Sequence, residues 1–190
     1  MSEIRFYKED QNENLRLRTI CRWLVDIMVI LAMAFFVVRM TGNRVEVRGQ
    51  SMDPTLQAGN VVLYDKIWYN FFSPERFQII AFTLSDNEED SRVYVKRIIG
   101  LPGETVQIVG GEVYIDGEKI TLPVEFVGLF PGGLAEAPVT LGDDEFFLLG
   151  DNPSGSEDSR FTVVGNVPRS NILGKVWLRI SPFKDIGPVH

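Results

Sequence analysis

The sequence predicts a mostly β protein, in which an N-terminal transmembrane helix precedes an antiparallel β domain with a small β-hairpin/meander extension. Three observations lead to this class. One apolar run near the N-terminus is long enough to cross a membrane, the chain after it shows short runs of period-two hydrophobicity, and two dipeptides there are typical of tight hairpin turns. With 190 residues, 45% of them hydrophobic, the chain suits one anchor and one domain rather than two large domains.

The apolar run at 23–38 lies between Arg22 and Arg39. It is slightly shorter than the ~20 residues that span a bilayer, but its neighbours extend it, and we expect a transmembrane segment at 19–41. Asp26 is a charge inside this segment. It lies one turn from the Arg22 end, where its carboxylate can reach the lipid headgroups instead of the apolar centre of the bilayer.

A cleaved secretory signal is the alternative interpretation of this run, because Ala32-Met33-Ala34 has the small-x-small pattern of a cleavage site. Cleavage there would leave an apolar stub at 35–38, and the polar leader of 22 residues before the run is long for a signal peptide, so we favour an uncleaved anchor. Basic residues lie on both sides of the helix. The positive-inside rule therefore favours a cytoplasmic leader only weakly.

Short alternating runs predict the strands of the domain at 42–190. The predicted strands are 44–48, 60–65, 77–83, 92–99, 105–109, 112–115, 145–149 and 175–180. Gly110-Gly111 and Asp116-Gly117 predict two-residue hairpins, because both central positions of a type I′ turn require positive φ. These turns make 105–120 a small meander. The Pro- and Gly-rich chain at 122–142 is predicted to be irregular, so that 105–143 forms an insertion of hairpins and irregular chain.

The segment 67–77 is rich in aromatic residues and is open to two interpretations. Aromatic side chains of this density either fill a core, which is the interpretation we favour, or lie at a lipid interface.

The composition excludes several kinds of chemistry. Cys21 is the single cysteine, so an intramolecular disulfide and a cysteine-based zinc cluster are excluded. The single histidine, His190, is the last residue and a poor candidate for a catalytic base, because termini are rarely held in place. The chain carries 19 Lys and Arg against 26 Asp and Glu, and the acidic excess lies beyond the helix, which disfavours nucleic-acid binding.

Three separated segments contain candidate chemical groups. In 49–56, Ser51 follows a strand and precedes Pro54, which suits a hydroxyl held on a rigid turn, although an ordinary hydrogen-bonded serine turn is equally compatible. The third segment, 150–160, is a polar loop with many short hydroxyls and carboxylates, placed directly after an apolar strand. It suits a support for a site as well as a plain turn.

The second segment, 94–104, contains Lys96 in an alternating strand. Tyr94, Lys96 and Ile98 share one face of this strand. A lysine there is usually solvated, but burial of this face would disfavour the ammonium and lower the pKa of Lys96. The lysine would then accept a proton near neutral pH, as a serine-lysine dyad requires.

Together the three segments resemble the type I signal peptidases of the short, single-anchor bacterial type. The family's Ser-Met-x-Pro-Thr motif is matched at 51–55, its Lys-Arg pair leading into Gly-x-Pro-Gly-Glu at 96–104, and its Gly-Asp-Asn followed by Ser-x-Asp-Ser-Arg at 150–160. The motifs occur in the family's order. The resemblance covers the chain from the helix to about Arg160.

The resemblance implies a serine endopeptidase in which Ser51 is the nucleophile and Lys96 is its general base, with no cofactor and no metal. It also implies supporting roles for the third segment. Ser156 would hydrogen-bond the lysine nitrogen, Asp158 and Arg160 would form a salt-bridged pair, and Asp151 and Asn152 would hold the loop.

The resemblance leaves the oxyanion hole incomplete. The Ser51 backbone N–H is the natural first donor to the oxyanion. Some family members add a side-chain hydroxyl two residues before the nucleophile, where this chain has Gly49, so the second donor is not identified.

The family's substrates are secreted preproteins with small residues at the first and third positions before the cut, bound as an extended strand. The resemblance thus implies removal of N-terminal signal peptides at the bacterial cytoplasmic membrane. The leader, at 1–18, would be cytoplasmic, the helix would contact lipid, and the β peptidase domain would be extracytoplasmic. Two alternatives remain: a processing peptidase dedicated to a single substrate, and a catalytically inactive membrane-anchored binding protein.

Overall fold

The computed structural model of the chain describes residues 18–36, 43–66, 68–84, 92–124 and 131–189. Two compact units form, Met1–Gly42 and Asn43–His190. The first contains the helix Arg18–Phe36, which is long and apolar enough to cross a membrane. Its 19 residues span about 28 Å at 1.5 Å per residue. Residues 1–17 of the predicted leader and 37–41 of the predicted span lie outside the described residues.

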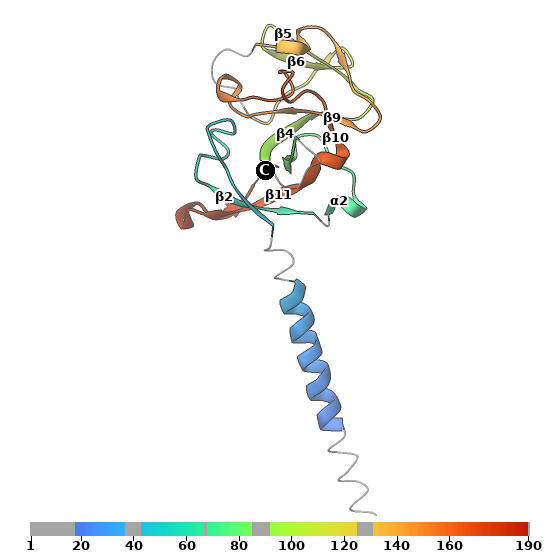
Figure 1. Ribbon diagram of the computed structural model, residues 1–190, viewed down its shortest axis with the longest axis vertical. Helices are drawn as coiled ribbons and strands as arrows, with labels where there is room; N and C mark the ends of the chain where they lie inside the picture. Colours follow the sequence, from blue (N-terminus) through green and yellow to red (C-terminus); the bar gives the residue numbers. More distant parts are fainter. Residues whose placement is uncertain (1–17, 37–42, 67, 85–91, 125–130, 190) are drawn as a thin grey trace, which may run out of the picture. The chain divides into compact units, whose positions relative to one another are not determined.

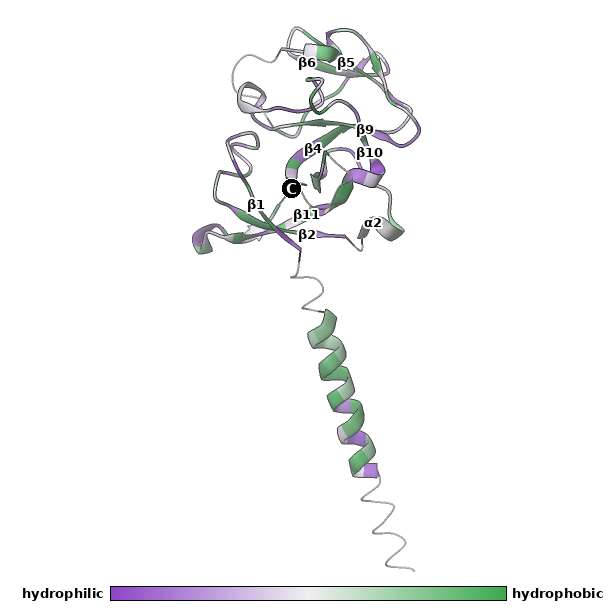
Figure 2. Cartoon of the chain, viewed as in Figure 1, coloured by the Kyte–Doolittle hydropathy of each residue, from purple (hydrophilic) through white to green (hydrophobic). Residues whose placement is uncertain are grey.

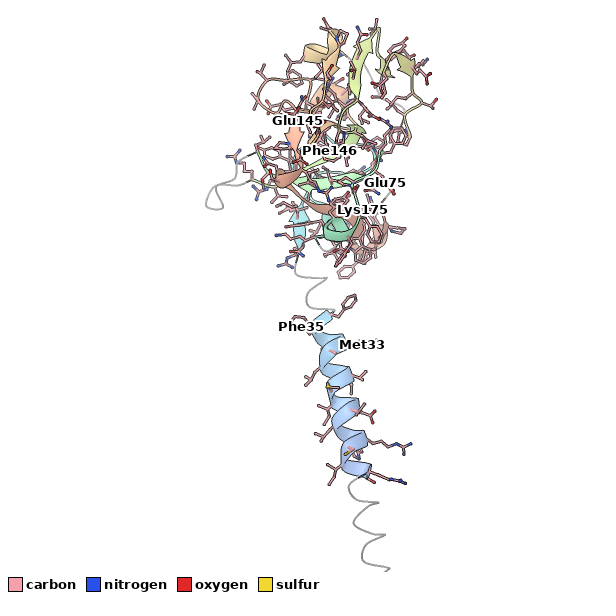
Figure 3. All side chains as sticks on the ribbon, turned by 90° about the vertical axis from the view of Figure 1, so that its right-hand side faces the viewer. Met33, Phe35, Glu75, Glu145, Phe146 and Lys175 are labelled. Atoms are coloured by element: carbon pink, nitrogen blue, oxygen red, sulfur yellow. The ribbon has the colours of Figure 1, made fainter. Side chains whose placement is uncertain are left out.

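The helix presents apolar side chains around its whole circumference. Figure 2 shows it as hydrophobic along its length, with hydrophilic positions gathered toward its Arg18 end. Met33 and Phe35 project from the opposite end (Figure 3), with exposed fractions of 68% and 71%. A helix that is apolar all round and is not covered by protein is typical of a membrane-spanning segment.

The second unit is built from two antiparallel sheets (Figure 1). The larger sheet has the order β1-β2-β11-β3-β4-β9-β10, with β12 paired to β11, and the smaller has the order β7-β6-β5-β8. The strands of the larger sheet are β1 (Arg44–Glu46), β2 (Val61–Asp65), β3 (Ile79–Phe82), β4 (Tyr94–Gly100), β9 (Glu145–Leu149), β10 (Val167–Pro168), β11 (Ile172–Ser181) and β12 (Gly187–Pro188). Those of the smaller sheet are β5 (Thr105–Val109), β6 (Glu112–Ile115), β7 (Glu118–Lys119) and β8 (Val139–Thr140).

The predicted meander is confirmed. The turn residues Gly110, Gly111, Asp116 and Gly117 all have positive φ, between 51° and 84°, as type I′ turns require. They join β5 to β6 and β6 to β7 in antiparallel register. Within the domain, this small sheet lies at the end opposite to β2 and the short helix α2 (Trp68–Phe71), as Figure 1 shows.

The predicted irregular segment contains some regular structure. A short 3-10 helix, η1 (Gly133–Glu136), and β8 lie within it, and β8 pairs with β5. The prediction was therefore wrong for these residues, because a two-residue strand carries no hydrophobic period. Residues 125–130 lie outside the described part of the chain.

The aromatic segment divides between the two interpretations. Tyr69 is buried, and its hydroxyl donates to Gln78 Oε1 at 2.8 Å. Phe77 packs against a core cluster of the domain. Phe71 and Phe72 are instead exposed, by 78% and 53%. Burial in the core thus accounts for only part of this segment.

Strand β4 separates two regions of the core, as its alternation predicts. Tyr94 and Ile98 pack with Ile80 and Leu148, whereas Val95 packs with Met52 on the other side. Both charged residues of the strand, Lys96 and Arg97, are buried, with exposed fractions of 4% and 2%. Adjacent buried cations on opposite faces of one strand need specific partners.

Arg97 obtains a full set of partners. Its Nε and Nη2 donate to the two carboxylate oxygens of Asp151, at 2.8 and 2.7 Å, and its Nη1 donates to the Phe77 carbonyl at 2.8 Å. Asp151 is itself fully buried. This bidentate pair joins β4 to the chain that leaves β9.

Removing one member of the pair should destabilise the domain strongly. In Asp151→Ala the guanidinium of Arg97 stays buried without its carboxylate, and we expect a loss of about 3 to 5 kcal/mol in the free energy of unfolding. Urea titration of the full-length protein in detergent measures this loss. Glu112→Ala is the matched control, because it breaks a half-exposed ion pair with Lys119 and should change stability by less than about 1 kcal/mol. Equal losses in the two variants would contradict the expectation.

Gly100 should tolerate no side chain, because β4 passes close to the small sheet there. A Cβ at this position would lie 2.5 Å from Val106 Cγ2 and 2.9 Å from Phe147 Cβ. Gly100→Ala should therefore cost about 1 to 3 kcal/mol through overpacking. Gly187→Ala, where a Cβ meets nothing within 4 Å, should be close to neutral in the same titration. A neutral Gly100→Ala would show that the two sheets separate easily at this point.

Candidate active site

Ser51 lies in the loop between β1 and β2, on a turn that packs onto the hydrophobic core. The next residue, Met52, and Leu56 are completely buried. The Leu56 amide donates to the Met52 carbonyl at 2.8 Å, and the Asp53 amide donates to the Gln50 carbonyl at 3.2 Å. Ser51 itself is half-buried. The buried side chains of Met52 and Leu56, on either side of Pro54, therefore fix the turn, and Ser51 stays at the surface of the domain.

Asp151 connects this turn to β4. Thr55 Oγ1 donates to Asp151 Oδ2 at 2.6 Å, and the same carboxylate accepts both bonds from Arg97. One buried carboxylate thus joins three segments: the turn at 50–56 that contains Ser51 (the serine turn), strand β4 that contains Lys96 (the lysine strand), and the polar loop 150–160. An ionised carboxylate that accepts three short hydrogen bonds makes a strong and directional junction.

Asn152 adds two further bonds to the serine turn. Its backbone amide donates to the Ser51 carbonyl, and its side-chain Nδ2 donates to the Gln50 carbonyl, both at 3.0 Å. Asn152 of the polar loop therefore donates hydrogen bonds to two successive carbonyls of the serine turn, those of Gln50 and Ser51. Asp151 and Asn152, which the sequence predicts to hold the loop, thus both donate to or accept from the turn that contains Ser51.

Gly150 is the point at which the three segments meet. Leu149, the residue before Gly150, pairs with Arg97, the residue after Lys96. A Cβ on Gly150 would overlap with the Ser51 carbonyl oxygen and with the Ser156 side chain. The main chain of Ser51 and the side chain of Ser156 therefore lie against one glycine, which directly follows the residue that pairs with the strand of Lys96.

Lys96 has the electrostatic environment that the serine-lysine hypothesis requires. Burial lowers the pKa of its amine to about 8, since desolvation penalises the ammonium more than the neutral amine. Asp158 is the largest opposing influence and raises the pKa, whereas Arg160 lowers it further; Asp151 and Glu157 raise it by less. A substantial part of the lysine is therefore neutral in mildly alkaline solution.

The expected pair between Asp158 and Arg160 is present. Arg160 Nε donates to Asp158 Oδ1 at 2.8 Å and its Nη2 donates to Oδ2 at 2.9 Å, with both side chains fully buried. Asp158 Oδ2 also accepts the hydroxyl proton of Ser156 at 2.7 Å and the Gly150 amide at 3.1 Å. The pair thus fixes the direction in which the Ser156 hydroxyl points.

Sequence reasoning missed the roles of three residues. Thr55 and Arg97 lie inside the recognised motifs, but no role was assigned to them, and their shared partner Asp151 shows that they join the segments. Arg179 lies in no motif. Its contact with the serine turn depends on the pairing of β11 with β2, which the alternation of 175–180 does not reveal.

Comparison with known proteins shows the family of the chain. The family model of the signal peptidases, peptidase S26, matches residues 20–181. A probable signal peptidase I-2 of Synechocystis sp. is 37% identical over 142 residues, which cover 72% of this chain and 62% of that protein. The chain therefore spans less than two thirds of that relative's length.

Further relatives extend the match. The signal peptidase I of Leptolyngbya laminosa is 38% identical, over 73% of this chain and 68% of that protein. The signal peptidase I of Bacillus caldolyticus is 34% identical, over 85% of this chain and 90% of that protein. A crystal structure of a signal peptidase I from Enterococcus faecalis is 29% identical, covers 55% of this chain and 97% of its own, and has a TM-score of 0.44. Because a family model matches most of its length and the Leptolyngbya and Bacillus relatives are more than 30% identical, the chain belongs to the signal peptidase family, peptidase S26.

Proposed function

We propose that this protein is a membrane-anchored serine endopeptidase that removes N-terminal signal peptides from secreted preproteins with a Ser51-Lys96 dyad. The relatives named signal peptidase I support the activity. The observation that carries the dyad is a buried lysine with a pKa of about 8, on a strand that pairs with Leu149. The chain that follows Leu149 contacts the Ser51 carbonyl at Gly150 and Asn152. The helix Arg18–Phe36 would anchor the chain in the bacterial cytoplasmic membrane as a single span, with a cytoplasmic leader and an extracytoplasmic domain.

In the proposed reaction, neutral Lys96 accepts the hydroxyl proton of Ser51 as its Oγ attacks the scissile carbonyl. The tetrahedral intermediate collapses to an acyl-enzyme, and the lysine ammonium returns the proton to the leaving amine. Water, deprotonated by the neutral lysine, then hydrolyses the ester. The steps need no metal and no cofactor, because the buried amine supplies both the base and the acid.

The hydrogen bond from Ser156 to Asp158 supports an orienting role for Ser156. A neutral lysine has two N–H bonds and one lone pair, and the lone pair must face Ser51 for the proton transfer. Because the Ser156 proton is directed to Asp158, the Ser156 oxygen is left as an acceptor. It can then bind a lysine N–H without competing for the lone pair.

The first oxyanion donor in this proposal is the Ser51 backbone N–H, on a turn whose neighbouring carbonyls are held by Asn152. A fixed peptide plane needs no reorganisation as charge develops on the substrate oxygen. Substrates would bind as an extended strand with small residues at the first and third positions before the cut. The acidic excess of the domain argues against nucleic acid as a partner.

Loss of either dyad residue should abolish cleavage. We expect Ser51→Ala and Lys96→Ala to lower the rate of preprotein cleavage in detergent by more than about 10³-fold while the domain stays folded, because neither variant can form the acyl-enzyme. Cleavage is measured by gel, and the cut site by mass. Ser170→Ala and Lys119→Ala, at exposed positions, are matched controls that should keep wild-type rates. Wild-type activity in Lys96→Ala would overturn the mechanism.

The pH dependence should report the lysine. Because neutral Lys96 is the active form, kcat/KM should rise as the pH rises through the pKa of about 8 and should fall below it. Glu157 is exposed and raises this pKa, so Glu157→Gln should move the acidic limb to lower pH, by less than about one pH unit. Glu118→Gln, in the small sheet, removes the same charge and should leave the limb in place. A limb that follows neither prediction would assign the titration to another group.

A further inference from the structure

Arg179 of β11 contacts the loop between β1 and β2 at two of its residues. Its Nη1 donates to the Thr55 carbonyl at 3.3 Å and to Asn60 Oδ1 at 3.4 Å. Its Nε donates to the Asp185 carbonyl at 2.6 Å. The guanidinium therefore joins the loop between β1 and β2 to the C-terminal chain that follows β11.

All three acceptors are uncharged oxygens. Asn60 is buried, and its Oδ1 also accepts the Gln57 amide at 3.2 Å. Arg179 therefore contacts the loop at Thr55 and at Asn60. These two hydrogen bonds hold the part of the loop that follows Ser51 against β11. A planar guanidinium with several donors suits such a clamp better than a single ammonium would.

Thr55 is consequently held at two different atoms. Its hydroxyl donates to Asp151, which also accepts from Arg97 of β4, and its carbonyl accepts from Arg179, which belongs to the C-terminal hairpin of β11 and β12 (172–188). Displacement of Thr55 in either direction would lengthen one of these bonds. Since a single turn connects Thr55 to Ser51, the position of the serine hydroxyl depends on both contacts.

The C-terminal hairpin in turn holds Arg179. Arg179 pairs with Gly187 of β12 and with Val62 of β2, and a register shift follows it in β11. The Asp185 carbonyl that accepts from its Nε belongs to the short 3-10 helix η4 (Phe183–Asp185). The side chain thus extends from a strand that is bonded on both edges.

We propose that Arg179 is a positioning residue for the nucleophile: it holds the Ser51 turn at the distance from Lys96 that proton transfer requires. The proposal rests on the proposed function, since it concerns the same dyad. Arg179 takes no part in the chemistry, so its loss should lower kcat while substrate affinity and the titration of Lys96 stay unchanged.

The test compares full-length variants in detergent. Arg179→Gln should lower kcat for a model preprotein about tenfold, with KM within about twofold of wild type and the acidic limb of the pH profile unmoved. Arg179→Lys keeps one charged donor and should recover part of kcat. Lys184→Gln removes the same charge from an exposed position in the same hairpin and should behave as wild type. A purely stabilising role would lower the unfolding midpoint and leave kcat intact at temperatures where the variant is folded.

Each other outcome is also decisive. A folded Arg179→Gln with kcat within about twofold of wild type overturns the proposal, and so does an equal loss in Lys184→Gln. If the Gln variant does not fold, Arg179→Met keeps the apolar stem and must show the same loss of kcat. Failure of both to fold overturns the proposal, because Arg179 would then stabilise the domain rather than position the turn. Inactive Ser51→Ala and Lys96→Ala beside an unaffected Arg179→Gln would reject this inference alone and leave the dyad intact.

Discussion

The site depends on the carboxylate of Asp151, which accepts hydrogen bonds from Arg97 and Thr55 inside the protein. A fully buried carboxylate is tolerated only when charged and polar donors surround it, and a buried guanidinium only when acceptors do. Each of these groups therefore makes the others possible. Because they come from three distant parts of the chain, satisfying them also brings the serine turn, the lysine strand and the polar loop together.

The two neighbouring basic residues of β4 have different surroundings. The guanidinium of Arg97 forms a bidentate ion pair with Asp151, whereas Lys96 is desolvated and its pKa falls to about 8. Asp158 limits this fall and Arg160 increases it, and the two are themselves a buried pair. The basicity of the lysine is thus set by a balance between desolvation and fixed charges, and it does not require direct contact with an acid.

Much of this structure could be predicted from local patterns. The strands at 105–109, 112–115 and 145–149 have the predicted bounds. Alternation and glycine turns determine the first two, and the third is a continuous apolar run that a polar loop follows. The two-residue strands such as β10 and β12 carry no such pattern. The exposure of Phe71 and Phe72 depends on how α2 sits on the sheet, and the contact of Arg179 with Thr55 joins residues 124 positions apart. Pairing over that distance leaves no local trace in the sequence.

Gly150 carries no side chain, and its surroundings leave no room for one. The consequence concerns how mutational data on such a protein are understood. A substitution as mild as a methyl group there pushes the main chain of the serine turn away from the polar loop, so a screen would rank this glycine beside the reacting residues. In this structure, an inactivating substitution can therefore mark a position where the site has no room for a side chain, as well as a residue that takes part in the reaction.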